Sequence, residues 1–254
     1  MTTVVRPFLF AWHFLTAIPL SRRHHEPTAM ELASSMAWYS TIGLLIGGTL
    51  VLADVILAKV VSSEVVNALL IVILVLLTRG LHQDGLADTL DGLAGGRTPA
   101  ERLPIMRDPR VGAVGATGLF LSLLLRFAAL VALPHALRVP ALLCMPAVGR
   151  WAMVTVAWLS PYARSEGGLA APFLVHLSFP HVLASSMVLM SALVIGLGVS
   201  GAVGTMLLSG GVVIAARAGC RVWFGGVTGD TLGATNELAE IVFLLFLPFL
   251  LLVQ

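Results

Sequence analysis

The stretch VVNALLIVILVLLTRGLHQDGLADTLDGLAGG, residues 65–96, joins the two features around which this chain is organised. Its first part, residues 65–78, is apolar and suits the interior of a lipid bilayer. Its second part carries three aspartates, and no lysine or arginine occurs between Arg79 and Arg97. We expect the apolar part to be a membrane span whose helix continues past the membrane surface through the first aspartates.

The three aspartates, Asp84, Asp88 and Asp91, stand at positions i, i+4 and i+7. On an α-helix these positions project within a sector of about 60°. Like charges at this spacing repel by a few tenths of a kcal/mol in water, and by more where the dielectric constant is lower. Since no cationic side chain lies among them, the pattern predicts a bound divalent metal. Carboxylate oxygens favour Mg²⁺, Mn²⁺ or Ca²⁺ over softer metals.

Glycines accompany the acids at positions 85, 92, 95 and 96. Each would weaken an ordinary helix by up to about 1 kcal/mol. We expect them to thin the surface beside the carboxylates, so that a bulky substrate can approach the backbone. The alternative interpretation is a polar helix end at the membrane surface with a flexible loop behind it. We favour a functional site, because acids in or beside a membrane usually serve function.

The composition excludes a soluble protein. Of 254 residues, 58% are hydrophobic and 11% charged, and the mean hydropathy is +0.97. Several apolar runs suit helical spans of about 20 residues, whereas a β-barrel would show short alternating segments. We predict an all-α, polytopic membrane bundle that forms one domain over residues 1–254. A short interfacial helix at 8–20 precedes seven predicted spans, at about 36–59, 65–78, 111–134, 140–159, 182–199, 203–217 and 238–253.

The distribution of basic residues predicts the orientation of this bundle. With the N-terminus inside, eleven arginines fall in cytoplasmic segments and only Lys59 and Arg138 fall outside. The acidic stretch then faces the cytoplasm of a bacterial cell with the bundle in its inner membrane. Arg126 and Arg150 lie within spans, at a cost of about 2.5–3.5 kcal/mol each, so each should face a polar cavity, an acidic partner or a phosphate. Asp54, toward the far end of its span, is expected to reach the interface.

A second polar stretch, RAGCRVWFGGVTGDTLGATNELAEI, occupies residues 217–241. Asp230, Asn236, Glu237 and Glu240 in it offer oxygen ligands or a general base. Thr235 or Asn236 could cap the last helix and place Glu237 in its first turn, where a negative charge is favourable. Capping would explain one acid but not Asp230 and Glu240 as well. Because both polar stretches fall on the cytoplasmic side, we predict that they form one site.

Three motifs, HQDGLADTLDGLAGG (82–96), ERLPIMRDPRVGAVG (101–115) and GGVTGDTLGATNELAE (225–240), together resemble the cobalamin synthase family. FLTAIPL (14–20) and PYARSEG (161–167) also look like that family, so the resemblance covers essentially the whole chain. These enzymes are adenosylcobinamide-GDP ribazoletransferases, also called cobalamin-5′-phosphate synthases. The resemblance implies that α-ribazole or its 5′-phosphate attacks the phosphate attached to cobinamide, GMP leaves and Mg²⁺ is required.

A more distant likeness is to the CDP-alcohol phosphotransferases, whose pattern is D-x2-D-G-x2-A-R-x8-G-x3-D-x3-D. Asp88-x2-Asp91-Gly92 matches its start, while Gly95 and Gly96 replace the Ala-Arg and only Asp108 falls near the later aspartates. We therefore take Asp84, Asp88, Asp91 and Asp108 as candidate metal ligands. Candidate substrate-binding residues are His82, Arg107, Arg110, Arg150 and Asn236. The candidate general bases are Asp108, Asp230, Glu237 and Glu240.

Two other functions are compatible with parts of this pattern. An ion-coupled transporter would also place acids on glycine-rich broken helices, although its acids would lie at the midplane and its halves would repeat. A CDP-alcohol phosphotransferase of lipid synthesis would share the first aspartates, but the rest of its motif is broken here. We expect adenosylcobinamide-GDP, α-ribazole or its phosphate, and membrane lipid as partners, and no nucleic acid. A homo-oligomer is compatible with the sequence.

Overall fold

The computed structural model describes residues 2–20 and 26–251, and every regular element within them is a helix. The expected all-α fold is therefore confirmed for this part of the chain. In chain order the elements are α1 (Thr2–Leu15), α2 (Ala29–Ser35), the 3-10 turn η1 (Met36–Trp38), α3 (Tyr39–Leu57), α4 (Ser63–Thr78), α5 (Leu81–Gly95), α6 (Pro99–Ile105), α7 (Ala113–Ala132), the 3-10 turn η2 (His135–Leu137), α8 (Arg138–Leu159), α9 (Ala171–Val175), α10 (Phe179–Phe224) and α11 (Gly229–Leu251).

Several of these helices suit a membrane. Five in the described residues are long and apolar enough to cross a bilayer, and the number reaches six if the bent pair α4–α5 counts as one span. Their outer faces carry large apolar side chains, including Phe120, Ile195 and Leu207, which are 65%, 87% and 74% exposed. Such a surface is unfavourable in water and suits lipid. The chain is a multi-pass membrane protein.

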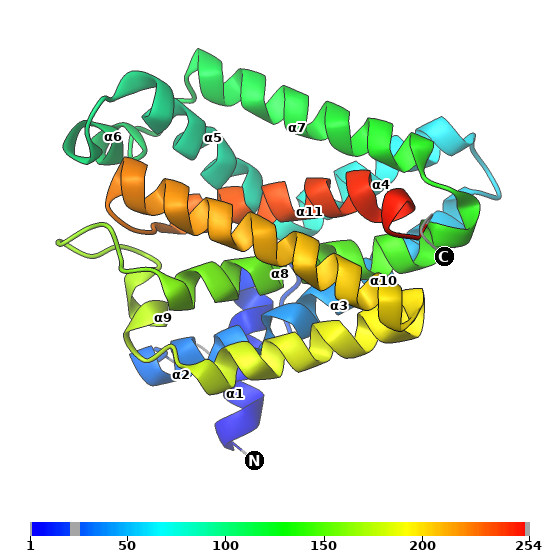
Figure 1. Cartoon of the computed structure of the whole chain (residues 1–254), viewed down its shortest axis with the longest axis horizontal. Coiled ribbons are helices and arrows are strands. Elements are labelled where there is room, and N and C mark those ends of the chain that lie inside the picture. Colours follow the sequence, from blue (N-terminus) through cyan, green and yellow to red (C-terminus); the bar gives the residue numbers. More distant parts are fainter. Residues whose placement is uncertain (1, 21–25, 252–254) are drawn as a thin grey trace.

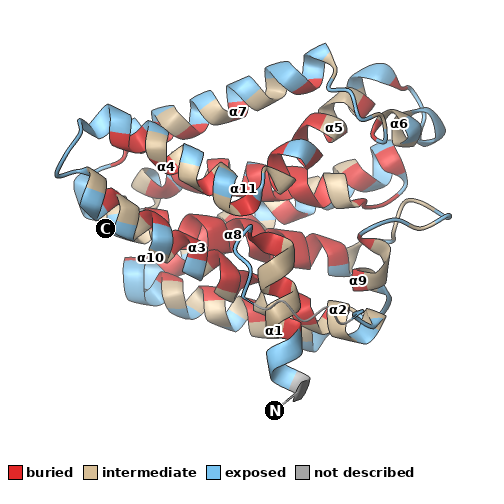
Figure 2. Ribbon diagram, turned by 180° about the vertical axis from the view of Figure 1, so that it is seen from behind, coloured by how far each residue is buried: buried red, intermediate tan, exposed pale blue. Residues whose placement is uncertain are grey.

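Helix α8 lies at the centre of the bundle, with α3, α10 and α11 packed around it (Figures 1 and 2). Apart from Arg138 and Arg150 it is largely apolar, and it is buried along most of its length, as expected of a helix with neighbours all round. Small residues let α3 approach it closely. A Cβ atom on Gly43 would lie 2.5 Å from the Ala147 Cα, so a larger residue there would push the two helices apart.

Helix α4 does not continue into α5, so the expectation of one helix through the aspartates is wrong. Arg79 and Gly80 both adopt left-handed backbone conformations, with φ of 55° and 66°, and the two helix axes meet at 89°. This conformation costs little at Gly80. The Arg79 guanidinium donates to the His13 carbonyl oxygen at 2.8 Å, which ties the bend to the end of α1. As a result α5 packs against α7 and α11.

Helix α10 is 46 residues long, but Gly198 interrupts it with a non-helical φ of 72°. The chain turns back at this point, so that the two halves run side by side in opposite directions (Figure 1). Both ends of α10 consequently lie near the end of α8. The Phe179 ring is 5.7 Å from that of Trp158, and Arg217 donates to the Leu159 carbonyl oxygen at 2.9 Å. The two halves correspond to the spans expected at 182–199 and 203–217.

The last helix, α11, begins at Gly229 and not near residue 238 as expected. Thr228 caps it, because the Thr228 hydroxyl accepts from the Thr231 N–H while the Thr231 hydroxyl accepts from the Thr228 N–H. Asp230 therefore lies in the first turn, where a negative charge is favourable. Glu237 lies two turns further along, so the expected first-turn position of Glu237 is wrong.

At the end of the bundle away from the acidic stretch, Asp54, which was expected to reach the interface, is buried within the protein near the end of α3. Its carboxylate accepts two hydrogen bonds from the Arg138 Nε and one from Nη2, over 2.6–3.0 Å. Arg138 also donates to Asn67 at 2.8 Å. A buried carboxylate is tolerated when it is paired and hydrogen-bonded in this way. The pair links α3 and α4 to the start of α8.

Candidate active site

Helix α5 carries all three aspartates of the first polar stretch, as predicted, but they face different spaces. Asp88 and Asp91 line a cavity of about 420 Å³ together with Asp108 and Arg110. We call this space the acidic cavity. Asp84 instead lines two other cavities, of about 680 and 130 Å³, on the side of α1. The four candidate metal ligands are thus divided, with three around one space and Asp84 beside it.

Asp91 has a structural role besides its place at the acidic cavity. One carboxylate oxygen accepts from the Gly112 N–H at 2.7 Å and the other from the Gly115 N–H at 2.8 Å. These N–H groups belong to the start of α7, so Asp91 caps that helix and compensates its dipole. A Cβ atom on Gly112 would lie 2.5 Å from the Asp91 carboxylate. Glycine at this position is therefore what allows the contact.

Asp108 lies in the loop between α6 and α7 and is held by Arg110. Arg110 Nε donates to one carboxylate oxygen at 2.9 Å and Nη2 to the other at 2.6 Å. These hydrogen bonds lower the pKa of Asp108 to about 2. Asp108 is therefore ionised at neutral pH and is a weak proton acceptor. Arg107 pairs with Glu166 at 2.9 Å, which connects this loop to the loop that follows α8.

The donor set suits Mg²⁺ in part. Within the described residues, no three His, Cys, Asp or Glu side chains are close enough to hold an ion by themselves. Mg²⁺ in phosphate-transfer sites is usually bound by one or two carboxylates, with waters and substrate phosphates completing its shell. Asp88 and Asp91 around a shared space match this arrangement. The residues therefore fit a Mg²⁺ ion that is completed by a phosphorylated substrate.

The two polar stretches, more than 120 residues apart in the chain, come together as predicted. Helix α11 packs along α5, and Gly85 lies so close to Asp230 that a Cβ atom there would be 2.6 Å from the Asp230 carbonyl oxygen. Gln83 donates to Glu237 at 3.1 Å. Asp84 and Asp230 line the same cavity of about 130 Å³. One region of the molecule thus contains the acids of both motifs.

Three glycines of the first motif allow close helix packing, and they do not open the surface for a substrate as expected. Gly85 packs against the α11 backbone, and added Cβ atoms at Gly92 and Gly96 would lie 2.6 Å from the side chains of Met106 and Arg102. These glycines bring α5 into contact with α6 and α11, and no open surface results at these three positions. The expectation that they clear space for a substrate is wrong there.

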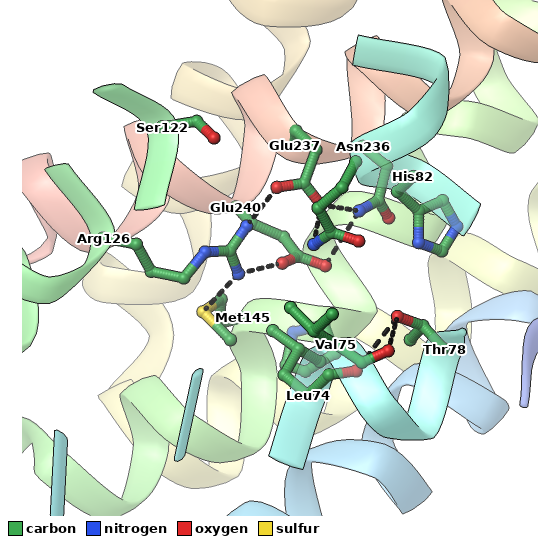
Figure 3. A network of polar contacts seen from close by, with 12 residues as sticks. Leu74, Val75, Thr78, His82, Ser122, Arg126, Met145, Asn236, Glu237 and Glu240 are labelled. Carbon is green, nitrogen blue, oxygen red and sulfur yellow. Dashed lines mark hydrogen bonds and ion pairs between the residues drawn. The ribbon is translucent and has the colours of Figure 1, made fainter. Parts of the chain in front are cut away.

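Four charged residues form a buried cluster that we call the charged network: Arg126, Arg150, Glu237 and Glu240. Figure 3 shows Arg126 beside the two glutamates. All four side chains are 1% exposed. Arg126 pairs with Glu237 at 2.7 Å and also with Glu240, which in turn pairs with Arg150. Two positive and two negative charges cancel, so the network as a whole is neutral. The acidic partners expected for the arginines within spans are therefore found.

The network also holds two candidates for substrate binding. Asn236 donates to Glu240 at 3.0 Å, and its contacts in the described residues are with the glutamates. Arg150 Nη2 lies 3.4 Å from His82 Nδ1. Neither Glu237 nor Glu240 lines any of the three cavities that contain the aspartates. The structure gives these glutamates a role in packing, and their role in catalysis stays a prediction.

Sequence reasoning assigned no role to Arg164, which lies in the loop after α8. Its Nη2 donates to an Asp230 oxygen at 3.0 Å, and its side chain is 9% exposed. Asp230 Oδ2 also accepts from the Thr228 hydroxyl at 3.2 Å. The only signal in the sequence was the motif PYARSEG, which contains this arginine. The pairing itself could not be foreseen, because 66 residues separate the two side chains.

Comparison with known proteins identifies the family. A family model described as cobalamin-5-phosphate synthase matches residues 7–248. An adenosylcobinamide-GDP ribazoletransferase of Syntrophobacter fumaroxidans is 43% identical over 91% of this chain and 96% of its own length. Enzymes of the same name from Chlorobaculum tepidum and Pseudomonas entomophila are 38% and 39% identical, over 89% and 96% of this chain and 88% and 99% of their own lengths. No solved structure matches. The chain, with its acidic cavity and its two polar motifs in contact, belongs to the cobalamin-5-phosphate synthase family.

Proposed function

We propose that this enzyme is a Mg²⁺-dependent adenosylcobinamide-GDP ribazoletransferase. A ribose hydroxyl of α-ribazole, or of its 5′-phosphate, attacks the phosphorus attached to cobinamide. A new P–O bond forms, the diphosphate P–O bond breaks and GMP leaves. The observation that carries the proposal is the grouping of two unlike spaces along α5: an acidic cavity with an arginine at its edge, and a cavity lined by Asp230. A third cavity, of about 680 Å³, shares Val111 with the first and Asp84 with the second. The names of the relatives support the same activity.

The acidic cavity is the proposed site of the diphosphate. When bound, Mg²⁺ supplies charge neutralisation and orients the phosphates. Asp88 and Asp91 would hold it, with Asp84 and Asp108 as further ligands from the two sides. Arg110 and Arg107 are both exposed at this end of the bundle, where their guanidinium groups can contact phosphate oxygens. Such contacts would stabilise the negative charge that develops as GMP departs.

Asp230 is the proposed acceptor of the proton from the ribose hydroxyl. Its Oδ2 is engaged by Arg164 and Thr228, whereas Oδ1 makes no hydrogen bond with the residues that the structure describes. Asp108 is a weaker choice, because both of its oxygens are held by Arg110 and its pKa is low. Glu237 and Glu240 are the least suited, since their charges are already neutralised by arginines.

The proposed topology has seven crossings with the N-terminus in the cytoplasm of the inner membrane. α3, α4, α7, α8, the two halves of α10 and α11 would each cross once, while α5 lies at the cytoplasmic end. Single cysteines introduced at the exposed positions Thr98 and Ser165 should then react only from the cytoplasm, and one at Val60 only from outside. Cys144 and Cys220, both buried, would first be replaced by serine. Labelling of position 98 or 165 from outside would contradict this orientation.

Turnover tests the proposed function directly. The enzyme in lipid nanodiscs with Mg²⁺, adenosylcobinamide-GDP and α-ribazole should release GMP and form the joined corrinoid in equal amounts. A parallel reaction with CDP-diacylglycerol and α-ribazole should release no CMP. Release of CMP without any GMP would instead indicate a CDP-alcohol phosphotransferase. Flux of substrate into liposomes in the absence of GMP release would indicate a transporter.

A further inference from the structure

A cavity of about 130 Å³ borders the first turn of α5, whereas the acidic cavity borders its later turns. Its walls are mainly apolar, with His82, Asp84, Arg164 and Asp230 as the ionisable residues among them. Phe14, Leu81, Met153, Tyr162 and Leu169 line it. The Phe14 ring is itself held in place, because its centroid lies 4.9 Å from that of Phe173. The larger cavity of about 680 Å³ shares Phe14, Leu81 and Leu169, so the two spaces adjoin. We call the smaller space the aromatic cavity.

His82 presents a hydrogen-bond donor that has no partner in the part of the chain that the structure describes. The side chain is 1% exposed and lines the aromatic cavity. Its Nδ1 lies 3.4 Å from Arg150 Nη2, and a guanidinium can only donate, so Nδ1 is the acceptor. The proton of the neutral ring is then on Nε2. Within the described residues, Nε2 has no hydrogen-bond partner, which is unfavourable for a buried donor.

The charged network explains why this tautomer is stable. Arg150 is bound to Glu240, so its position is determined by groups outside the aromatic cavity. In Figure 3 the His82 ring lies at the edge of the network, on the far side of Asn236 from Arg126. The ring thus connects a fixed ionic cluster to an apolar space. A ligand atom that accepts a hydrogen bond in this space would satisfy Nε2–H.

We infer that the aromatic cavity binds the benzimidazole base of the ribazole acceptor, with His82 Nε2–H donating to the unsubstituted ring nitrogen. This inference rests on the proposed function and adds the position of one substrate. A planar base with an acceptor nitrogen matches apolar walls that carry unpaired donors. Within the described residues His82 Nε2, the Tyr162 hydroxyl and Arg164 Nε belong to lining residues and have no hydrogen-bond partner, and of these His82 is the donor that we assign to the ring nitrogen. Asp230 lines the same cavity, so the attached ribose would lie beside the proposed proton acceptor. Asp84 would lie between the base and the diphosphate.

The test uses the free bases, so that it does not depend on turnover. 5,6-Dimethylbenzimidazole and 5,6-dimethylindole have nearly the same shape, but the indole lacks the acceptor nitrogen. Isothermal titration with the wild-type enzyme in nanodiscs should show at least about tenfold tighter binding of the benzimidazole, because the indole leaves the donor unpaired. Equal binding of the two bases would overturn the inference.

Two variants of His82 extend this comparison. His82→Phe removes the donor and should abolish the discrimination between the two bases, whereas His82→Gln keeps an N–H group and should retain part of it. Unchanged affinity for adenosylcobinamide-GDP in both variants shows that they are folded. A His82→Phe variant that still discriminates tenfold would overturn the role of His82.

A third variant addresses the cavity without touching the charged network. Among residues outside its own helix turn, a Cβ atom on Gly229 would have only the Ala170 Cβ within 4 Å, at 3.8 Å, so a side chain can be added there and Gly229→Val adds volume to the cavity lining. It should weaken binding of 5,6-dimethylbenzimidazole at least about tenfold and leave adenosylcobinamide-GDP binding unchanged. Wild-type affinity for the base would place it elsewhere. Base binding with discrimination but no GMP release would instead refute the proposed function and keep the cavity assignment.

Discussion

Two aspartates of α5, Asp84 and Asp88, and two glutamates of α11, Glu237 and Glu240, carry the same kind of group in opposite surroundings. Asp84 and Asp88 form no ion pair within the described residues and border cavities, and neither is fully buried. Glu237 and Glu240 are completely buried and each is paired with arginine. The difference teaches that the number of acids in a motif does not identify its function. What matters is whether the protein itself already neutralises their charge.

This contrast divides the acids into those that form no ion pair within the described residues, Asp84 and Asp88, and those that arginines already neutralise, Glu237 and Glu240. Asp84 and Asp88, which form no ion pair within the described residues, can bind a metal ion together with a phosphorylated substrate. Glutamates with arginine partners hold four helices together, since Arg126 comes from α7, Arg150 from α8 and the glutamates from α11, while Gln83 of α5 donates to Glu237. The following predictions test this division.

Breaking the charged network should have the largest effect. Arg126→Met leaves a buried glutamate without its partner, which costs about 3–5 kcal/mol, so little folded protein should be recovered. The double variant Arg126→Met/Glu237→Gln removes a charge of each sign and should regain much of the lost stability. Thermal unfolding in detergent measures both.

The exposed ion pair between Arg110 and Asp108 provides the control for this experiment. Arg110→Met should leave the melting temperature unchanged, because an exposed pair contributes little. A single Arg126→Met variant as stable as the wild type would mean that the network does not hold the helices together.

Removal of the metal should stop turnover without unfolding the protein. In the proposed function the aspartates of α5 act through a bound cation, whereas the charged network contains its own positive charges. Excess chelator should therefore abolish GMP release, Mg²⁺ should restore it, and the melting temperature without substrates should not change. Full GMP release after the metal has been stripped would contradict the metal site.

Neutralising single aspartates of α5 should reduce turnover and separate their roles. Asp88→Asn and Asp84→Asn should lower kcat about 100- to 1,000-fold, since lost transition-state stabilisation of this kind amounts to about 2.7–4 kcal/mol. Both should melt like the wild type. Asp91→Asn should lose activity and also about 0.5–2 kcal/mol of stability, because Asp91 caps α7. If all three variants kept wild-type rates, Asp84, Asp88 and Asp91 would form only a polar helix end without a catalytic role.

Of the four perturbations, replacement of Asp230 should have the smallest effect, and it should lower kcat without weakening substrate binding. Asp230→Asn should lower kcat about 100-fold, as expected for loss of a general base, while the affinity for adenosylcobinamide-GDP stays near that of the wild type. Isothermal titration of Asp230→Asn beside Asp88→Asn measures the difference. If Asp230→Asn lost this binding and Asp88→Asn kept it, the proposed roles of the two motifs would be reversed.

The sequence by itself was sufficient for the membrane class and for most of the long helices. The spans expected at 111–134 and 140–159 correspond to α7 and α8, because long apolar runs can satisfy their backbone groups in lipid only as helices. Asp84, Asp88 and Asp91 also share one helix as their spacing predicts. Apolar run length and helical periodicity are local properties, so they can be read without knowledge of the fold.

Only the tertiary structure decided where the helices bend and which charges meet. Arg79 and Gly80 turn the chain through 89°, a backbone choice that the apolar pattern does not contain. Arg126 pairs with Glu237, which lies 111 residues further along the chain. Which arginine pairs with which acid depends on how α7, α8 and α11 pack against one another. The same packing places Asp88 at the wall of a cavity and buries Glu240 completely. Contacts between distant segments depend on the whole arrangement of helices. For this reason the different roles of chemically similar carboxylates become visible only in the folded chain.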